Sequence, residues 1–366
     1  MEKVRIALIG AGMITGKHLS SYQKIPEAEV VAVCSRTRQS AERCAQQWNI
    51  PEACTDIQAL LARDDIDAVD ICLHNNLHAP VTIAALNAGK HVYCEKPLAG
   101  SWADGKAMLD AAERAGKTLH IQLGFLYRTY ARAAKRLIDG GARGEIYHAR
   151  TVGFRRRNRP FVDGIYGKDF VHKEFSGGGA LYDFGVYHIS LMLYLMGMPK
   201  PLRMSGCQYQ QIPMDEARRV ESGYDVQEMG VGFVRLDGGR SMDVFETWAV
   251  HLDKMDPGTL LGSRGGIKLD PFSYHTTMCD LELDCTGDLE KMEERWQHIH
   301  PLEYAYSNSE AHWIAALLGR VPMIPTAQLA LDTLLIQEGI DLSGQLGREV
   351  SAEETIAASR PTALQI

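Results

Sequence analysis

The sequence VRIALIGAGMITGKHL, residues 4–19, decides the fold of this protein. Its first six residues form an apolar run, which is typical of a strand buried on both faces of a parallel sheet. Gly10 and Gly12 follow, and a stretch of helical composition continues to about Lys24. Gly10 permits a tight turn, and Gly12 lets the backbone approach a pyrophosphate held at the helix N-terminus. Thr15 occupies the third position of this fingerprint, where Gly or Ala is usual.

The alternation of short strands and helical segments continues to about residue 123. We expect strands at 29–34, 68–73, 90–94 and 118–123, and helical segments at 39–48, 56–63, 79–88 and 101–115. Gly89 and Gly116 follow two of the helices, where a left-handed C-cap favours glycine. Right-handed crossovers at this spacing give a doubly wound parallel sheet. The pattern therefore predicts a dinucleotide-binding Rossmann domain over residues 1–124.

The pattern changes after residue 141. Segments 146–154, 202–210, 228–236 and 241–249 alternate like strands with one wet face, with hairpin turns at 237–239 and 263–266. A last helix is expected at about 326–342, ending near Gly344. We therefore expect residues 125–366 to form an α+β domain with a large, mostly antiparallel open sheet, which makes the whole chain α/β.

Composition excludes several classes of function. The 366 residues include 39 Lys plus Arg and 46 Asp plus Glu, a net charge of -7, which argues against a nucleic-acid or anionic-membrane surface. No apolar run approaches the roughly 20 residues of a membrane helix, and the N-terminus has no signal-peptide pattern. The eight cysteines are scattered without a C-x-x-C motif. They predict reduced residues in a cytoplasmic enzyme, with neither a disulfide framework nor a zinc site.

The end of the second strand bears on the choice of nicotinamide cofactor. It is followed by Ser35 and Arg36, and no acid lies within reach. A carboxylate at this point holds the ribose 2′-OH of NAD, whereas Arg or Ser favours a 2′-phosphate. NADP is therefore the favoured cofactor and NAD remains possible, because Arg36 could equally be a solvated residue at the helix start.

Lys96 follows the strand expected at 90–94, within Glu95-Lys96-Pro97. Open α/β sheets place their chemistry at the carboxyl ends of the strands. A Lys96 ammonium there can hydrogen-bond a substrate hydroxyl, and burial beside a cationic nicotinamide is expected to lower its pKa. The alternative is an ordinary solvated lysine in a loop.

Three motifs together resemble the glucose–fructose oxidoreductase/inositol dehydrogenase (Gfo/Idh/MocA) family: IGAGM at 9–13, AGKHVYCEKPLA at 88–99 and GGGALYDFGVYH at 177–188. The resemblance implies NAD(P)-dependent oxidation or reduction of a secondary alcohol on a sugar, glycoside or cyclitol. It also implies a homo-oligomer, a dimer or a tetramer, formed through the C-terminal sheet.

The resemblance also implies catalytic residues. Lys96 is expected to contact both cofactor and substrate, and Asp183 to orient the substrate. The family has a histidine four residues after the aspartate, where this chain has Tyr187 followed by His188. Residues i and i+4 share a helix face, and i+5 is rotated by about 140°. We therefore favour Tyr187 over His188 for proton transfer. With an ordinary pKa of about 10, Tyr187 needs a nearby cation such as Lys96.

Further contacts are expected from the same resemblance and from local charge. Besides Gly10, Gly12, Ser35, Arg36 and Lys96, the expected cofactor contacts are Met13, Ile14, His74, Asn75, His78 and Glu95. Besides Lys96, Asp183 and Tyr187, the expected substrate contacts are Arg128, Arg156 and Lys173. The basic run 155–159 is otherwise a solvated strand end. No metal is expected, because Pro80 and a loop-like Asn75-Asn76 argue against a helix face bearing His74 and His78.

The sequence thus favours an oxidoreductase acting on a polyol. Two alternatives stay open. One is a glycoside-cleaving enzyme that oxidises C3 transiently with bound NAD, and the other is a regulator that senses NAD(P) without catalysis.

Overall fold

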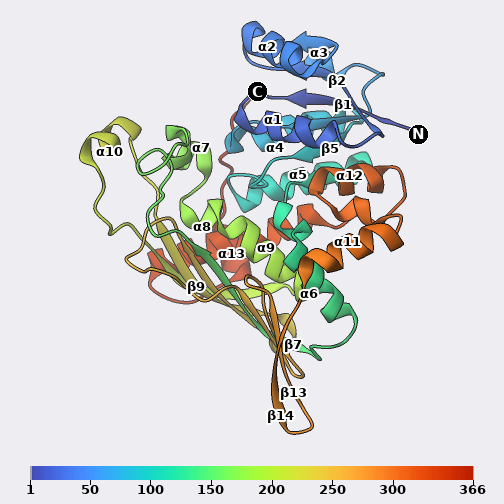
Figure 1. Cartoon of the computed structure of the whole chain (residues 1–366). Helices are drawn as coiled ribbons and strands as arrows, with labels where there is room; N and C mark the ends of the chain where they lie inside the picture. The colour runs from blue at the N-terminus through green and yellow to red at the C-terminus, as the bar shows by residue number, and fades with distance from the viewer. Residues whose placement is uncertain (1, 366) are drawn as a thin grey trace.

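The computed structural model describes residues 2–365 and contains two sheets with their helices (Figure 1). The smaller sheet has six parallel strands in the order β3-β2-β1-β4-β5-β6. Its strands are β1 (Val4–Ile9), β2 (Ala28–Cys34), β3 (Glu52–Cys54), β4 (Ala68–Ile71), β5 (His91–Cys94) and β6 (Leu119–Ile121). Its helices are α1 (Met13–Tyr22), α2 (Arg38–Trp48), α3 (Ile57–Leu61), α4 (Asn75–Asn87) and α5 (Trp102–Ala115). This strand order confirms the predicted doubly wound sheet.

The larger sheet has nine strands in the order β14-β13-β12-β11-β7-β10-β9-β8-β15. They are β7 (Ile146–Phe154), β8 (Pro201–Tyr209), β9 (Met229–Leu236), β10 (Ser241–Thr247), β11 (Thr259–Gly262), β12 (Gly266–Lys268), β13 (Ser273–Met278), β14 (Leu281–Thr286) and β15 (Val350–Ser351). Only β7 and β10 pair in parallel, so the prediction of a mostly antiparallel sheet is confirmed. Helices α9 (Gly185–Leu195) and α13 (Thr326–Leu346) lie against one face of this sheet (Figure 1).

Several elements of the second half escaped the sequence prediction. They are the β13–β14 hairpin, α6 (Thr129–Asp139), α7 (Lys173–Ser176), α10 (Glu216–Ser222), α11 (Leu289–Ile299) and α14 (Ala352–Ala358). The predicted end of the last helix near Gly344 was wrong. The helix continues through Gly344, which lies close to β8: a Cβ there would be 3.3 Å from the Gly206 carbonyl oxygen. It ends instead at Gly347, whose φ of 67° forms a left-handed cap.

Residues 75 and 76 also differ from the prediction, because they open α4 instead of forming a loop. Pro80 lies inside this helix and has no N–H to bond the carbonyl of Asn76. That carbonyl accepts a hydrogen bond from the N–H of Leu364 instead, at 3.0 Å. The helix therefore tolerates its proline because the C-terminal segment satisfies the free carbonyl.

The last part of the chain packs against the first sheet. Helix α12 (Ser309–Leu317) contacts α1, and the Trp313 ring lies 5.1 Å from the Tyr93 ring, centroid to centroid. The Thr326 hydroxyl accepts from the N–H of Ile121 at 2.8 Å. These contacts hold the two sheets as one body with a cavity between them. Over residues 2–365, no helix has both the length and the apolar content to cross a bilayer.

Candidate active site

A cavity of about 270 Å³ lies where the carboxyl ends of β4 and β5 meet the second half of the chain. Eight of the predicted site residues line it: Ile14, His74, Asn75, His78, Glu95, Lys96, Asp183 and Tyr187. The cavity therefore lies at the edge where open parallel sheets place their ligands.

The glycine turn beside the cavity fits a pyrophosphate. Gly10 has a φ of +113°, and a Cβ there would lie 2.2 Å from the Cys72 carbonyl oxygen. A Cβ on Gly12 would meet nothing within 4 Å, so the backbone at this point is open to a ligand. No side chain caps the first N–H groups of α1, and its first turn, which begins at the exposed Met13, has no acidic residue. Free N–H groups at a helix N-terminus bind phosphate well.

Thr15 fits where the fingerprint usually has Gly or Ala. Its buried hydroxyl donates to the Gly10 carbonyl at 3.0 Å, so the side chain is satisfied locally. Next to this turn, the N–H of Gly10 bonds the Cys34 carbonyl at 2.8 Å, which brings the end of β2 alongside. Ser35 and Arg36 follow directly. The Arg36 side chain is exposed and makes no ion pair with any residue from 2 to 365, so it is available to a 2′-phosphate.

Asn75 and His78 of α4, and His74 just before this helix, have different surroundings. The Asn75 amide donates to the Ser176 carbonyl at 3.0 Å, while its buried Oδ1 has no hydrogen-bond partner. This unpaired acceptor on the cavity wall fits an amide donor of a bound cofactor. The ring nitrogens of His78 lie 2.8 and 3.1 Å from the Pro97 and Leu73 carbonyls, so His78 joins two loops. His74 lies instead beside Asp169, 3.7 Å away.

Lys96 and Asp183 form the centre of the site. The Lys96 ammonium donates to Asp183 Oδ1 at 2.8 Å, and the Trp248 indole donates to Oδ2 at 3.2 Å. Burial acts to lower the pKa of Lys96, as expected, but the charges of Asp183, Tyr187 and Glu95 and the hydrogen bond to Asp183 together outweigh it, and the pKa is raised. Burial also opposes ionisation of Asp183, but the charges of Lys96 and Arg155 and the hydrogen bonds from Lys96 and Trp248 together outweigh it and lower the pKa of this carboxyl. Without a ligand, Lys96 therefore stays an ammonium, and the lowered pKa expected beside a bound cationic nicotinamide stays a prediction.

Asp183 is placed by the glycine triplet before it. A Cβ on Gly179 would lie 1.6 Å from the Gln227 carbonyl oxygen, so only glycine allows the chain to pass there. The short helix α8 (Ala180–Asp183) begins at this contact and carries Asp183 to the cavity.

Tyr187 and His188 lie on different sides of α9. Tyr187 lines the cavity, with its ring centroid 4.9 Å from the Lys96 ammonium and 4.6 Å from the Phe125 ring. His188 Nδ1 instead bonds the buried Glu246 carboxylate at 2.8 Å. Burial raises the pKa of Tyr187 even though the charge of Lys96 acts to lower it. The phenol is therefore protonated at neutral pH.

None of the predicted substrate residues outside the motifs lines the cavity. Arg128 is exposed, with its guanidinium carbon 5.4 Å from the centre of the Phe125 ring. Arg156 is exposed as well, and the Lys173 ammonium lies 3.9 Å from the Asp341 carboxylate. Arg155, the residue before Arg156, reaches the cavity instead, and its side chain lies on the ring of Phe184.

The sequence analysis also missed Trp248, Tyr166 and Phe170. Tyr166 and Phe170 line the cavity, whereas Trp248 is fully buried and touches the site only through Asp183. Tyr166 lies in irregular chain and Phe170 in a short 3-10 helix (Lys168–Val171), and no motif marks either. The basic run was the available signal for Arg155. The prediction that this run is a solvated strand end was wrong at Arg159, because that side chain is fully buried against Asp163 and Glu228.

A buried polar network supports the loop that carries Lys96. His18 Nδ1 lies 2.8 Å from Asp70, and its Nε2 lies 2.8 Å from Glu95 Oε1. The second Glu95 oxygen accepts from the backbone N–H of Lys96 at 2.9 Å. His18 was not predicted, because nothing in the sequence marks its partners. Through Glu95, it fixes the backbone that carries Lys96.

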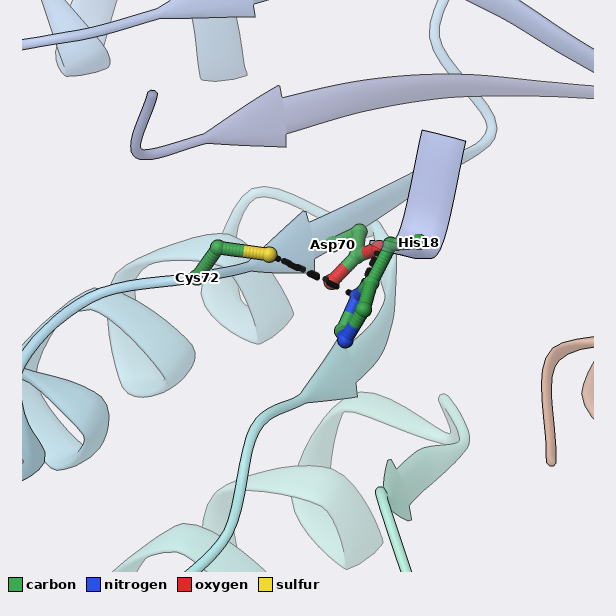
Figure 2. A group of neighbouring side chains, drawn as sticks. All are labelled: His18, Asp70 and Cys72. Carbon is green, nitrogen blue, oxygen red and sulfur yellow. Dashed lines mark hydrogen bonds and ion pairs between the residues drawn. The ribbon is translucent and has the colours of Figure 1, made fainter. Parts of the chain in front are cut away.

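His18, Asp70 and Cys72 lie close enough together to suggest a metal site (Figure 2). Burial acts to lower the pKa of His18, but the charges of Asp70 and Cys72 and the hydrogen bonds to them together outweigh it and raise that pKa well above its ordinary value. Burial raises the pKa of Cys72 to about 12. A metal requires an unprotonated nitrogen and a thiolate. In this structure both ring nitrogens of His18 instead face carboxylates, Asp70 and Glu95, at 2.8 Å each, so the ring serves the network under Lys96.

Comparison with known proteins assigns the family. Residues 4–123 match the model described as "Oxidoreductase family, NAD-binding Rossmann fold", and residues 131–268 match the Gfo/Idh/MocA C-terminal domain. The chain belongs to the Gfo/Idh/MocA family of oxidoreductases. The predicted resemblance is therefore confirmed, and the protein is an NAD(P)-dependent dehydrogenase.

Relatives of this Gfo/Idh/MocA dehydrogenase are similar along most of their length. The chain is 31% identical to scyllo-inositol 2-dehydrogenase (NADP(+)) of Bacillus subtilis, over 73% of this chain and 76% of that protein. It is 26% identical to D-glucoside 3-dehydrogenase of Escherichia coli, over 85% of this chain and 92% of that protein. An oxidoreductase domain protein from Kribbella flavida has the same fold, with a TM-score of 0.81 at 20% identity, covering 96% of this chain and all (100%) of that one.

Proposed function

We propose that this dehydrogenase interconverts a secondary alcohol and its ketone on a sugar, glycoside or cyclitol. The observation that carries the proposal is the contact of Lys96 with Asp183 and Tyr187, in a cavity next to the glycine turn. The names of the relatives, a glucoside dehydrogenase and an inositol dehydrogenase, support the substrate class.

The residues of the cavity divide the work on the substrate oxygen. When bound, the nicotinamide supplies or accepts the hydride. In the direction of reduction, Tyr187 gives its phenolic proton to the substrate oxygen, because its raised pKa keeps it protonated. The Lys96 ammonium hydrogen-bonds the same oxygen and stabilises its developing negative charge. Asp183 holds Lys96 in place at 2.8 Å and orients a neighbouring substrate hydroxyl.

We further propose NADP as the preferred cofactor. The support is the unpaired, exposed Arg36 at the end of β2. The backbone at Gly12 and the free N–H groups of α1 would hold the pyrophosphate of either cofactor.

The proposal is tested with a panel of sugars, cyclitols and their keto forms, followed at the reduced-nicotinamide band with NAD and NADP in turn. We expect turnover of at least one polyol. Lys96→Ala is expected to abolish that turnover while fluorescence titration shows that the cofactor still binds. Unchanged turnover in this variant would rule out the role of Lys96. Release of an aglycone without net change in nicotinamide absorbance would replace the proposal with glycoside cleavage, and cofactor binding without any turnover would indicate a sensor.

A further inference from the structure

Arg155 brings a positive charge into the cavity beside the catalytic cluster. It directly follows β7, and its backbone N–H bonds the Thr247 carbonyl at 3.1 Å, which fixes where the side chain starts. Its guanidinium carbon lies 3.8 Å from the centre of the Phe184 ring, next to Asp183 in the chain. The stacked ring holds the guanidinium fork in one plane at the cavity wall.

The hydrogen-bond donors of Arg155 are almost unused. A guanidinium has five N–H donors, and the one side-chain bond recorded for Arg155 goes to the Asn158 carbonyl at a long 3.5 Å. Within residues 2–365 no carboxylate lies in ion-pair range of it. Both oxygens of the nearby Asp183 are already bonded, to Lys96 and Trp248.

Among the neighbours of Arg155 in the basic run, Arg156 also lacks an ion pair with any residue that the structure describes but is exposed to solvent, whereas the next two arginines are paired. Arg157 pairs with Asp163 at 3.1 Å, and the buried Arg159 pairs with Asp163 and with Glu228. Burial lowers the pKa of Arg155, and the charge of Asp183 does not offset that effect. A half-buried guanidinium with free donors is costly unless an anion joins it.

We infer that the substrate is an anionic polyol, whose carboxylate or phosphate is bound by Arg155 while its hydroxyl lies at Lys96. The inference rests on the proposed function and names the substrate class of the same site. Arg155 would form two parallel hydrogen bonds to the anion, the geometry that its planar fork favours.

The test compares neutral and anionic substrates of the same stereochemistry. Each neutral polyol that turns over is assayed against its uronate and its 6-phosphate, which separates the two sources of the anion. We expect the wild type to have a kcat/KM about 10- to 100-fold higher for one of the anionic forms than for the neutral polyol, because the KM of the anionic form is lower. Arg155→Ala should bring that preference close to one and leave the KM of NAD(P) unchanged. Arg155→Lys should recover part of it. Arg157→Ala, which leaves Asp163 paired with Arg159, is the matched control and should behave as wild type.

Calorimetry makes the inference independent of turnover. D-glucuronate, D-galacturonate and the two corresponding 6-phosphates are titrated into the protein with its cofactor bound. We expect at least one to bind to the wild type and to lose about 10- to 100-fold in affinity with Arg155→Ala. Three results would overturn the inference: no binding of any anion, an equal loss for neutral and anionic substrates, or a raised KM for NAD(P) in Arg155→Ala. Turnover of neutral polyols with any of these would leave the proposed function standing.

Discussion

Replacing His18 by glutamine tests the buried network under Lys96. Glutamine is neutral and can bond only one of the two carboxylates, Asp70 and Glu95, that the ring nitrogens of His18 now face at 2.8 Å each. A hydrogen bond to a charged group contributes about 1.5–3 kcal/mol, and breaking a buried ion pair costs about 3–5 kcal/mol. Since His18 is only 1% exposed, solvent screening does not reduce this effect. We expect His18→Gln to lower the free energy of unfolding by about 3–5 kcal/mol, or Tm by about 4–7 °C for a chain of this length.

The pH dependence of this loss shows whether the charge on His18 is the cause. Its pKa is raised in the folded state, so its contribution is complete below the unfolded pKa of about 6.5. The contribution is lost as the pH rises through the folded pKa. The difference in stability between wild type and His18→Gln should therefore be largest near pH 6 and shrink toward higher pH.

Urea unfolding at several pH values from 6 to 10 measures this difference. His91→Gln is the matched control, because His91 bonds the Thr118 hydroxyl at 3.0 Å and burial lowers its pKa. We expect its effect to be small, below about 1.5 kcal/mol, and not to shrink with rising pH. A difference for His18→Gln that stays constant with pH, or grows, would refute the assignment of a charged imidazolium.

Three further predictions concern the reaction, the cofactor and the assembly. Tyr187→Phe should lower kcat by about 10²- to 10⁴-fold. In the wild type, the rate of alcohol oxidation should keep rising with pH beyond 9, because burial raises the pKa of Tyr187. Loss of that rise in His188→Asn, and not in Tyr187→Phe, would contradict the assignment of proton transfer to Tyr187. Arg36→Ala should raise KM for NADP at least about tenfold and leave KM for NAD unchanged, as steady-state kinetics would measure. We expect a dimer or tetramer formed through the open face of the larger sheet, where Val231 and Phe245 lie by a shallow hollow. Light scattering should show that Val231→Glu weakens the oligomer, and a monomeric wild type would contradict the expectation.

Much of the fold was predictable because it depends on neighbours in the chain. The apolar run of β1, the glycines after it and the helix that follows are contiguous, so their pattern specifies the unit without distant contacts. The placing of Tyr187 and His188 was predictable for the same reason. Helical spacing puts Tyr187 on the side of Asp183, and the structure has it in the cavity while His188 turns to Glu246.

The β13–β14 hairpin was missed because its signal is weak. Its strands are largely exposed, so they do not show the alternation of apolar and polar residues that marks a half-buried strand. Helix α4 was predicted to start too late, because the sequence cannot show that Leu364 satisfies the carbonyl that Pro80 leaves free.

By itself, the sequence determined the family, the parallel sheet, the glycine turn and the lysine at the strand end. The tertiary structure decided which charges meet. His18 lies 52 residues from Asp70 and 77 from Glu95 in the chain, and Lys96 lies 87 residues from Asp183. It also decided that Arg155, not Arg156, reaches the cavity. The physical reason is that hydrophobic period and helix spacing act between near neighbours, whereas the charge and burial of a side chain depend on residues that only folding brings within a few ångströms.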